Sequence, residues 1–248
     1  MFLNVYENFV NFIKNNRILF LIIFVFIISF VLYYIYIRNK KSNEKTRKEQ
    51  IRDMVTISIF ASLSIILYLT FKFSLPIFPE FLKINFSNLP IILGAFLLGN
   101  KKGLLIVLIR TIIVLPFSGT FFVGELADLI ISSSIVIVST YIYNKNRTLK
   151  GAIISLACVC ATWIVISALA NYFILIPAYV ELMFGGNEEV FISLLQVIPD
   201  VTVDNYQWKY ILFGAMPFNA LISVSVCIIT FLTYKRLSII FHKFDENE

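Results

Sequence analysis

The stretch that decides the fold is INFSNLPIILGAFLLGNKKGLLIVLIRTIIVLPFSGTFFVGELAD, residues 84–128, in which a few charges lie inside otherwise apolar sequence. Two apolar arms, 103–117 and 121–143, flank a turn-forming Ser-Gly-Thr at 118–120. Each arm is long enough to form a helix within a membrane. We therefore predict an antiparallel helical hairpin centred on this turn.

Three ionisable residues lie in the hairpin. Arg110 precedes Gly119 by nine residues and Asp128 follows it by nine, so antiparallel helices place the two charges opposite each other at one depth. Glu125 falls on the same helical face as Asp128. Because an isolated charge in hydrocarbon is costly, these residues must pair, face a cavity, or both. A structural ion pair and a ligand-lining cluster are both open interpretations.

The composition is that of a membrane protein. Of the 248 residues 59% are hydrophobic and 15% are charged, with a mean hydropathy of +0.86, which excludes a soluble globular domain. A transmembrane barrel would show short alternating segments rather than long apolar runs. We predict an all-α, polytopic protein of the cell membrane.

Basic residues give the topology. Four segments that alternate with the apolar runs hold fifteen of the 21 Lys and Arg, which makes these segments cytoplasmic by the positive-inside rule. The N-terminus is then outside and the C-terminus cytoplasmic. Residues 1–53 form an extra N-terminal transmembrane helix with a basic linker, and residues 54–248 form a six-helix unit. The predicted spans are 18–37, 54–73, 88–100, 103–117, 121–143, 151–177 and 209–234.

The loop over residues 71–86 is unusual for a loop outside the membrane. Pro76 and Pro79 break helix, while the surrounding Phe and Leu residues make the segment too apolar for free solution. We expect a lid on the outer surface, with Pro76, Phe78 and Phe81 as its candidate residues.

Small and polar residues mark three of the spans. Ser58, Ala61 and Ser62 are predicted to share one face of the span 54–73, where small side chains permit close helix contact. The buried amide of Asn171 needs a hydrogen-bond partner. Pro217 is predicted to kink the last span and to free backbone groups that face a cavity.

Sequence motifs for catalysis and metal binding are absent. The chain contains no G-x-x-x-x-G-K-[ST], G-x-S-x-G or H-E-x-x-H motif, and its three Cys lie within apolar runs, where they are predicted to be packing residues. We predict no catalytic residue, no metal and no nucleic-acid partner, and any ATP-driven role requires a partner protein. Two alternatives of other classes are an intramembrane enzyme that uses Glu125 and Asp128, and a structural membrane protein without a ligand.

Several stretches together resemble a known family. LPIFPEFLKINFSNLP is followed in order by GAFLLG, VGELAD, LANYFILIPAY (169–179) and MPFN (216–219). In these stretches the chain resembles the substrate-binding (S) components of energy-coupling factor (ECF) vitamin transporters, and most closely their riboflavin-specific group. The resemblance covers residues 54–237.

The resemblance implies a six-helix membrane protein without enzymatic activity or a cofactor, which binds a vitamin such as riboflavin near the outer surface beneath a lid. It also implies a complex with a transmembrane coupling subunit and two ATPases. By position, Asn171 and Asn219 would contact the ligand, and Ser58, Ala61 and Ser62 would contact the coupling subunit. The polar pocket candidates are Arg110, Glu125, Asp128, Asn171 and Asn219.

Five positions depart from the pattern of the riboflavin group. Asn85 and Asn88 stand where Asp is typical, Asp128 where Asn is typical, and Arg110 where Lys is common. Ile222 replaces a Lys that would contact the ligand. These departures leave open an S component for a different vitamin or related small molecule.

Overall fold

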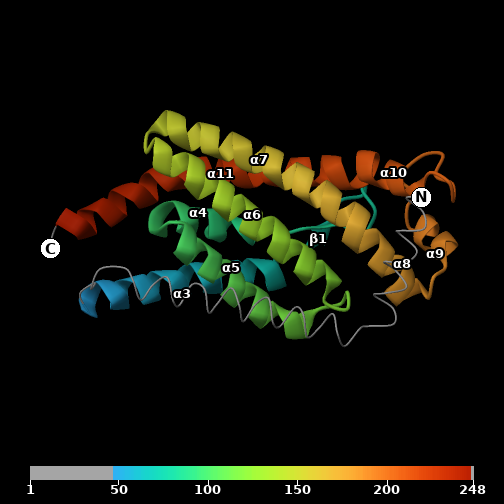
Figure 1. The fold of residues 1–248 in the computed structure, drawn as a ribbon, viewed down its shortest axis with the longest axis horizontal. Coiled ribbons are helices and arrows are strands. Elements are labelled where there is room, and N and C mark those ends of the chain that lie inside the picture. The colour runs from blue at the N-terminus through green and yellow to red at the C-terminus, as the bar shows by residue number, and fades with distance from the viewer. Residues whose placement is uncertain (1–46, 247–248) are drawn as a thin grey trace.

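The computed structural model describes residues 47–246, so the predicted span 18–37 lies outside the described part of the chain. The helices run along the long axis of an elongated bundle, with α8, α9 and α10 gathered at one end (Figure 1). The elements in chain order are α3 (Arg47–Thr70), β1 (Phe73–Ser74), β2 (Lys83–Ile84), α4 (Asn88–Leu98), α5 (Asn100–Val114), η1 (Leu115–Phe117), α6 (Val123–Lys145), α7 (Leu149–Ala170), η2 (Asn171–Leu175), α8 (Ile176–Phe184), α9 (Glu188–Ser193), α10 (Tyr206–Lys209), η3 (Tyr210–Ala215) and α11 (Met216–Glu246).

The helical segments confirm the predicted all-α class. Four helices in the described part are long and apolar enough to cross a membrane: Arg47–Thr70, Val123–Lys145, Leu149–Phe184 and Tyr206–Tyr234. The other two predicted spans correspond to α4 and α5, which have 11 and 15 residues. At 1.5 Å per residue they are roughly 16 and 22 Å long, less than the roughly 30 Å of a bilayer core.

Helix α4 lies at the centre of the bundle. It contacts α3, α5, α6 and α11, and its side chains from Pro90 to Phe96 are buried. Gly99, with φ +84°, makes the sharp turn into α5. At Gly103 an added Cβ would lie 2.8 Å from the Cβ of Ala95 and 2.9 Å from Val136. The short helices therefore pack closely because this position lacks a side chain.

The outward surface of the bundle is apolar. Ile59 on α3, Val165 on α7 and Leu232 on α11 are 59%, 54% and 64% exposed. An extensive surface of this kind is unfavourable in water, whereas lipid tails solvate it without cost.

The predicted lid segment between α3 and α4 contains a small antiparallel hairpin, which the sequence patterns did not indicate. Phe73 pairs with Ile84 and Ser74 with Lys83, while Phe78 and Pro79 of the intervening turn are buried. Because the prolines prevent a helix here, backbone groups close to an apolar surface find partners across the hairpin instead.

Two proline-linked distortions interrupt the long helices. Residues Asn171–Leu175 and Tyr210–Ala215 form π-helical turns, and each is followed by one residue and then by proline, Pro177 or Pro217. The N–H groups of Ile176 and Met216 reach back five residues, to the carbonyl oxygens of Asn171 and Ile211. The sequence predicted that Pro217 distorts the last span. The structure shows a π-helical turn before Pro217 and a second one before Pro177.

Replacing Gly103 by alanine should destabilise the bundle. Helix propensity alone would favour alanine by about 1 kcal/mol, but the added methyl group would collide with Ala95 and Val136. We expect the free energy of unfolding in detergent to fall by about 1–3 kcal/mol. Gly119→Ala is the matched control, because nothing lies within 4 Å of its added Cβ. Equal stability of the two variants would contradict the close packing.

Candidate functional site

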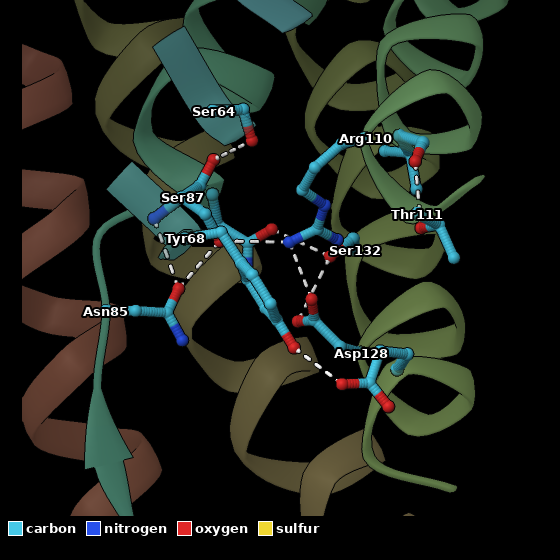
Figure 2. Close-up of polar contacts among 11 residues, drawn as sticks. Ser64, Tyr68, Asn85, Ser87, Arg110, Thr111, Asp128 and Ser132 are labelled. Carbon is cyan, nitrogen blue, oxygen red and sulfur yellow. Dashed lines mark hydrogen bonds and ion pairs between the residues drawn. The ribbon is translucent and has the colours of Figure 1, made fainter. Parts of the chain in front are cut away.

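Arg110 is the centre of a buried polar cluster (Figure 2). Its side chain is fully buried, and its Nη1 lies 2.5 Å from Oδ2 of Asp128. Nη1 also donates a hydrogen bond to Ser87 Oγ (2.9 Å), and Nη2 donates to Ser132 Oγ (2.8 Å). The predicted pairing of α5 with α6 through Arg110 and Asp128 is therefore confirmed.

Serine hydroxyls extend this cluster to the lid and to α3. Ser87 Oγ donates to Oδ1 of Asn85 at 2.6 Å, in the segment between β2 and α4 (Figure 2). Ser64 Oγ, on α3, donates to the carbonyl oxygen of Ser87 at 2.7 Å. Ser132 Oγ donates to Asn88 Oδ1 at 2.7 Å. The guanidinium group on α5 is thus connected to the segment before α4 and to three other helices, α3, α4 and α6.

Glu125 has a different set of partners. Its carboxylate accepts hydrogen bonds from Tyr68 Oη (3.2 Å), Ser118 Oγ (2.6 Å) and Thr120 Oγ1 (3.2 Å). Two of these donors lie in the turn between α5 and α6, where Phe121 and Phe122 adopt positive φ angles of 49° and 68°. Glu125 therefore holds the turn that joins α5 to α6, one helical turn away from the Arg110–Asp128 pair.

A second cation lies near these carboxylates. The ammonium group of Lys72 is 3.8 Å from the ring centroid of Tyr68. Partial desolvation lowers the pKa of Lys72, and the charges of Glu125 and Asp128 oppose that shift. The neighbouring cations Lys83 and Arg110 add to the lowering, so three cations and two carboxylates gather at this end of the bundle.

Asn171 and Asn219 lie on the other side of the bundle, where α7 and its extension pack against α11. Asn171 Nδ2 donates to the carbonyl oxygen of Ser167, and its Oδ1 accepts from Tyr210 Oη at 3.0 Å. Asn219 Oδ1 accepts from Trp163 Nε1 at 3.1 Å. The buried amide of Asn171 has the partner that the sequence required.

Trp163 and Tyr210 were not identified from the sequence. Both are at least 95% buried, with exposures of 5% and 1%. The signal that could have found them is chemical, because a buried indole N–H or phenol O–H needs a partner and the apolar spans contain few acceptors.

The aromatic residues of the predicted lid segment pack toward the helices that carry the two asparagines. The ring of Phe78 lies edge-on to Phe218, with 5.3 Å between centroids, and Phe218 adjoins Asn219 in the chain. Phe81 lies 5.7 Å from Tyr210 and 5.8 Å from Phe191. Pro76, the third lid candidate, is exposed. The lid is therefore packed onto the α7 and α11 side of the bundle.

The three small residues of α3 do not share one face. Ser58 and Ser62 are exposed, whereas Ala61 is 2% exposed and packs among the buried residues shared by α3, α4, α5 and α6. Only the two serines remain available on the outer surface. The helical repeat explains the difference. Ser58 and Ser62 are four residues apart and lie about 40° apart around the helix axis, whereas Ala61 lies about 100° from Ser62.

Comparison with known protein families identifies the family of this chain. A family profile described as "ECF transporter, substrate-specific component" matches residues 52–234. The chain is a member of this family. Its members are substrate-binding subunits of transporters rather than enzymes, so the alternative of an intramembrane enzyme is excluded.

Individual relatives agree with this assignment. The chain is 26% identical over 195 residues to riboflavin transporter RibU of Staphylococcus aureus, which covers 78% of this chain and 94% of the relative. It is 22% identical over 191 residues to riboflavin transporter FmnP of Bacillus subtilis, with 76% and 93% covered. A solved structure titled "Structure and mechanism of the S component of a bacterial ECF transporter" superposes with a TM-score of 0.59 at 23% identity, covering 77% of this chain and 98% of that one.

Family membership establishes where the protein is located and which components it functions with. It is a multi-pass protein of the cell membrane, and it functions with the membrane and ATPase components of an ECF transporter. The match to the family profile begins at Arg52, close to the start of the predicted six-helix unit.

The polar cluster can be tested by moving its negative charge. Asp128→Asn leaves Arg110 without a counter-charge and should lower the free energy of unfolding by about 3 kcal/mol, near the lower end for buried pairs because Asp128 is 24% exposed. Adding Asn88→Asp places a carboxylate one hydroxyl group away from Arg110 and should restore part of the loss. Thermal unfolding in detergent measures both effects.

Lys102→Ala is the control for this exchange, since it breaks the Lys102–Asp53 ion pair, whose side chains are 25% and 15% exposed. We expect it to cost less than Asp128→Asn. A double variant no more stable than the single one would show that Ser132 does not connect Asn88 to the guanidinium group.

Proposed function

We propose that this protein is the riboflavin-binding subunit of an ATP-driven ECF uptake transporter. The observation that carries the proposal is the lid, whose Phe78 and Phe81 pack beside the helices that present Asn171 and Asn219. The curated relatives that are riboflavin transporters support the choice of ligand.

The chemistry of this region suits a planar, partly polar vitamin. Aromatic and aliphatic side chains from the lid and α11 would cover the faces of a flat ring, at roughly 25 cal/mol for each Å² of apolar surface removed from water. Asn171 and Asn219 each retain one N–H and one oxygen lone pair after their internal hydrogen bonds are counted. These groups would read the polar edge or the hydroxyl groups of the ligand.

The charged residues have two roles in the proposal. Asp128, with 24% of its side chain exposed, is the one of the three that a ligand reaches most readily. Arg110 acts through Ser87 and Asn85, holding the root of the lid. Glu125 fixes the turn between α5 and α6, which borders the same outer end.

Most departures from the riboflavin pattern fall within one hydrogen-bonded network. Asn85, Asn88, Arg110 and Asp128 are all connected through Ser87 or Ser132. Two carboxylates typical of positions 85 and 88 are replaced here by one, Asp128 on α6, beside the cation. The hydrogen-bond network is kept, and these departures leave the identity of the vitamin open.

Ile222 is the observation that favours the alternative, an S component for a different vitamin. It is 5% exposed and belongs to the same apolar cluster as Phe78, Trp163 and Phe218. Where the riboflavin group has a cation, this chain therefore presents an apolar surface. A ligand with fewer polar groups at that position would fit this surface equally well.

The partner surface follows from the exposed serines of α3. We propose that Ser58 and Ser62 contact the transmembrane coupling subunit, which two ATPases drive, because small side chains permit close helix approach. Ala61 supports this surface from the inside of the bundle. The proposed orientation has the N-terminus outside and the C-terminus in the cytoplasm, as the distribution of Lys and Arg requires.

The ligand can be identified with purified protein. Protein in detergent should quench the fluorescence of added riboflavin in a saturable, one-to-one manner, or should carry the yellow vitamin through purification. A Phe78→Ala, Phe81→Ala double variant should bind at least tenfold more weakly, since the lid loses most of its apolar cover.

Tyr143→Phe is the control, because Tyr143 bonds Tyr234 (2.5 Å) in another part of the bundle. Its affinity should match that of the native chain. A protein that leaves riboflavin fluorescence unchanged but binds another vitamin would favour the alternative.

The proposed orientation is tested by cysteine labelling in intact cells. In a variant without Cys158, Cys160 and Cys227, a membrane-impermeant maleimide should label a cysteine at Asn187 directly, and one at Asn146 only after permeabilisation. The reverse pattern would invert the proposed topology.

A further inference from the structure

We propose that Trp163 and Tyr210 are positioning residues that fix the two asparagine amides and thereby set ligand specificity. This inference rests on the proposed function for the identity of the ligand. Each aromatic residue lies on the helix opposite its asparagine: Trp163 on α7 bonds Asn219 on α11, and Tyr210 on η3 bonds Asn171 on η2. The two hydrogen bonds therefore connect the same two helices in opposite directions.

The chemistry of their partners fixes the orientation of both amides. An indole N–H can only donate, so the atom of Asn219 at 3.1 Å from Trp163 must be its oxygen. In Asn171 the other end of the amide faces the carbonyl oxygen of Ser167 at 2.8 Å, which can only accept. Asn219 Nδ2 likewise faces the carbonyl oxygen of Ala215 at 2.8 Å. A flip would cost Asn219 two hydrogen bonds. It would cost Asn171 the bond to Ser167, because the Tyr210 hydroxyl can donate or accept.

The two oriented amides lie at different heights along the bundle axis, and each has the same kinds of hydrogen-bonding group left over. Trp163 and Asn171 are eight residues apart, which corresponds to roughly 12 Å along a helix. Each asparagine has one remaining N–H and one remaining oxygen lone pair. Under the proposed function, a ligand that offers an acceptor and a donor at each level would pair with these remaining groups.

The lid contacts both levels. Phe81 lies 5.7 Å from Tyr210, the residue that holds Asn171, and Phe78 lies 5.3 Å from Phe218, the neighbour of Asn219. The lid segment therefore packs against Tyr210, which holds Asn171, and against the chain neighbour of Asn219.

The π-helical turns place the partners opposite each other. Asn171 and Tyr210 are the first residues of η2 and η3, and the widened turns end just before Pro177 and Pro217. Because a π turn changes which side chains face inward, regular helices would carry the residues beyond it to another face. Such turns are frequent at functional sites.

Two conservative variants test the inference. Tyr210→Phe removes only the hydroxyl group, whereas Trp163→Phe removes the indole N–H together with part of the buried ring. Each leaves one hydrogen bond to an asparagine oxygen unmade. We expect each to weaken riboflavin binding by roughly 5- to 100-fold. Tyr143→Phe and Trp208→Phe are the matched controls: the first loses a hydroxyl bond elsewhere, and the second changes a tryptophan that is 60% exposed. Both should bind within about twofold of the native chain.

A specificity measurement separates positioning from general damage. The same titrations are made with lumiflavin, which lacks the ribityl hydroxyl groups, and with riboflavin methylated on its imide nitrogen. A positioning role predicts that each variant changes the ratio of its affinities for riboflavin and at least one analogue by fivefold or more. Equal loss for all three flavins would overturn the proposal.

A readout without ligand keeps this inference distinct from the proposed function. In protein labelled with ¹⁵N-asparagine, Tyr210→Phe should shift the side-chain amide signals of Asn171, and Trp163→Phe those of Asn219. Signals that do not move would overturn the positioning role even if riboflavin binds. A native chain that fails to bind riboflavin would instead overturn the proposed function, while the amide signals still decide the positioning role.

Discussion

The burial of one guanidinium group constrains the rest of this structure. Arg110 has no exposed surface, and a lone cation at such a position would be strongly unfavourable in a membrane. Its partners come from both neighbouring segments of the chain, Asp128 and Ser132 on α6 and Ser87 at the start of α4. Satisfying this group therefore sets the register of α5 against α6 and also fixes the point from which the lid emerges.

The sequence was sufficient to predict the elements whose signals are local or symmetric. Apolar runs located the helices, and the equal spacing of Arg110 and Asp128 from Gly119 predicted their ion pair. Two-residue strands carry no periodicity, so the hairpin at Phe73 and Ile84 was beyond a pattern argument. The prolines indicated only that no helix forms there.

The candidate site was predicted less completely, because its contacts join distant parts of the chain. Tyr68 and Glu125 are separated by 57 positions, Trp163 and Asn219 by 56, and Asn171 and Tyr210 by 39. Local sequence identifies a buried amide but not the aromatic donor that holds it. The same limit explains Ala61, whose neighbours on α4 and α5 decide that it faces inward.

The short helix α5 has a consequence for the surrounding bilayer. With η1 it extends over residues 100–117, roughly 27 Å at 1.5 Å per residue, while Ile112 and Ile113 on its outer side are 45% and 44% exposed. The long helices α7 and α11 on the other side exceed the hydrocarbon thickness. This unequal hydrophobic height favours a tilted resting position and local thinning of the lipid beside α5, at a cost of fractions of a kcal/mol per Å of mismatch. The tilt of the subunit therefore depends on the thickness of the bilayer around it.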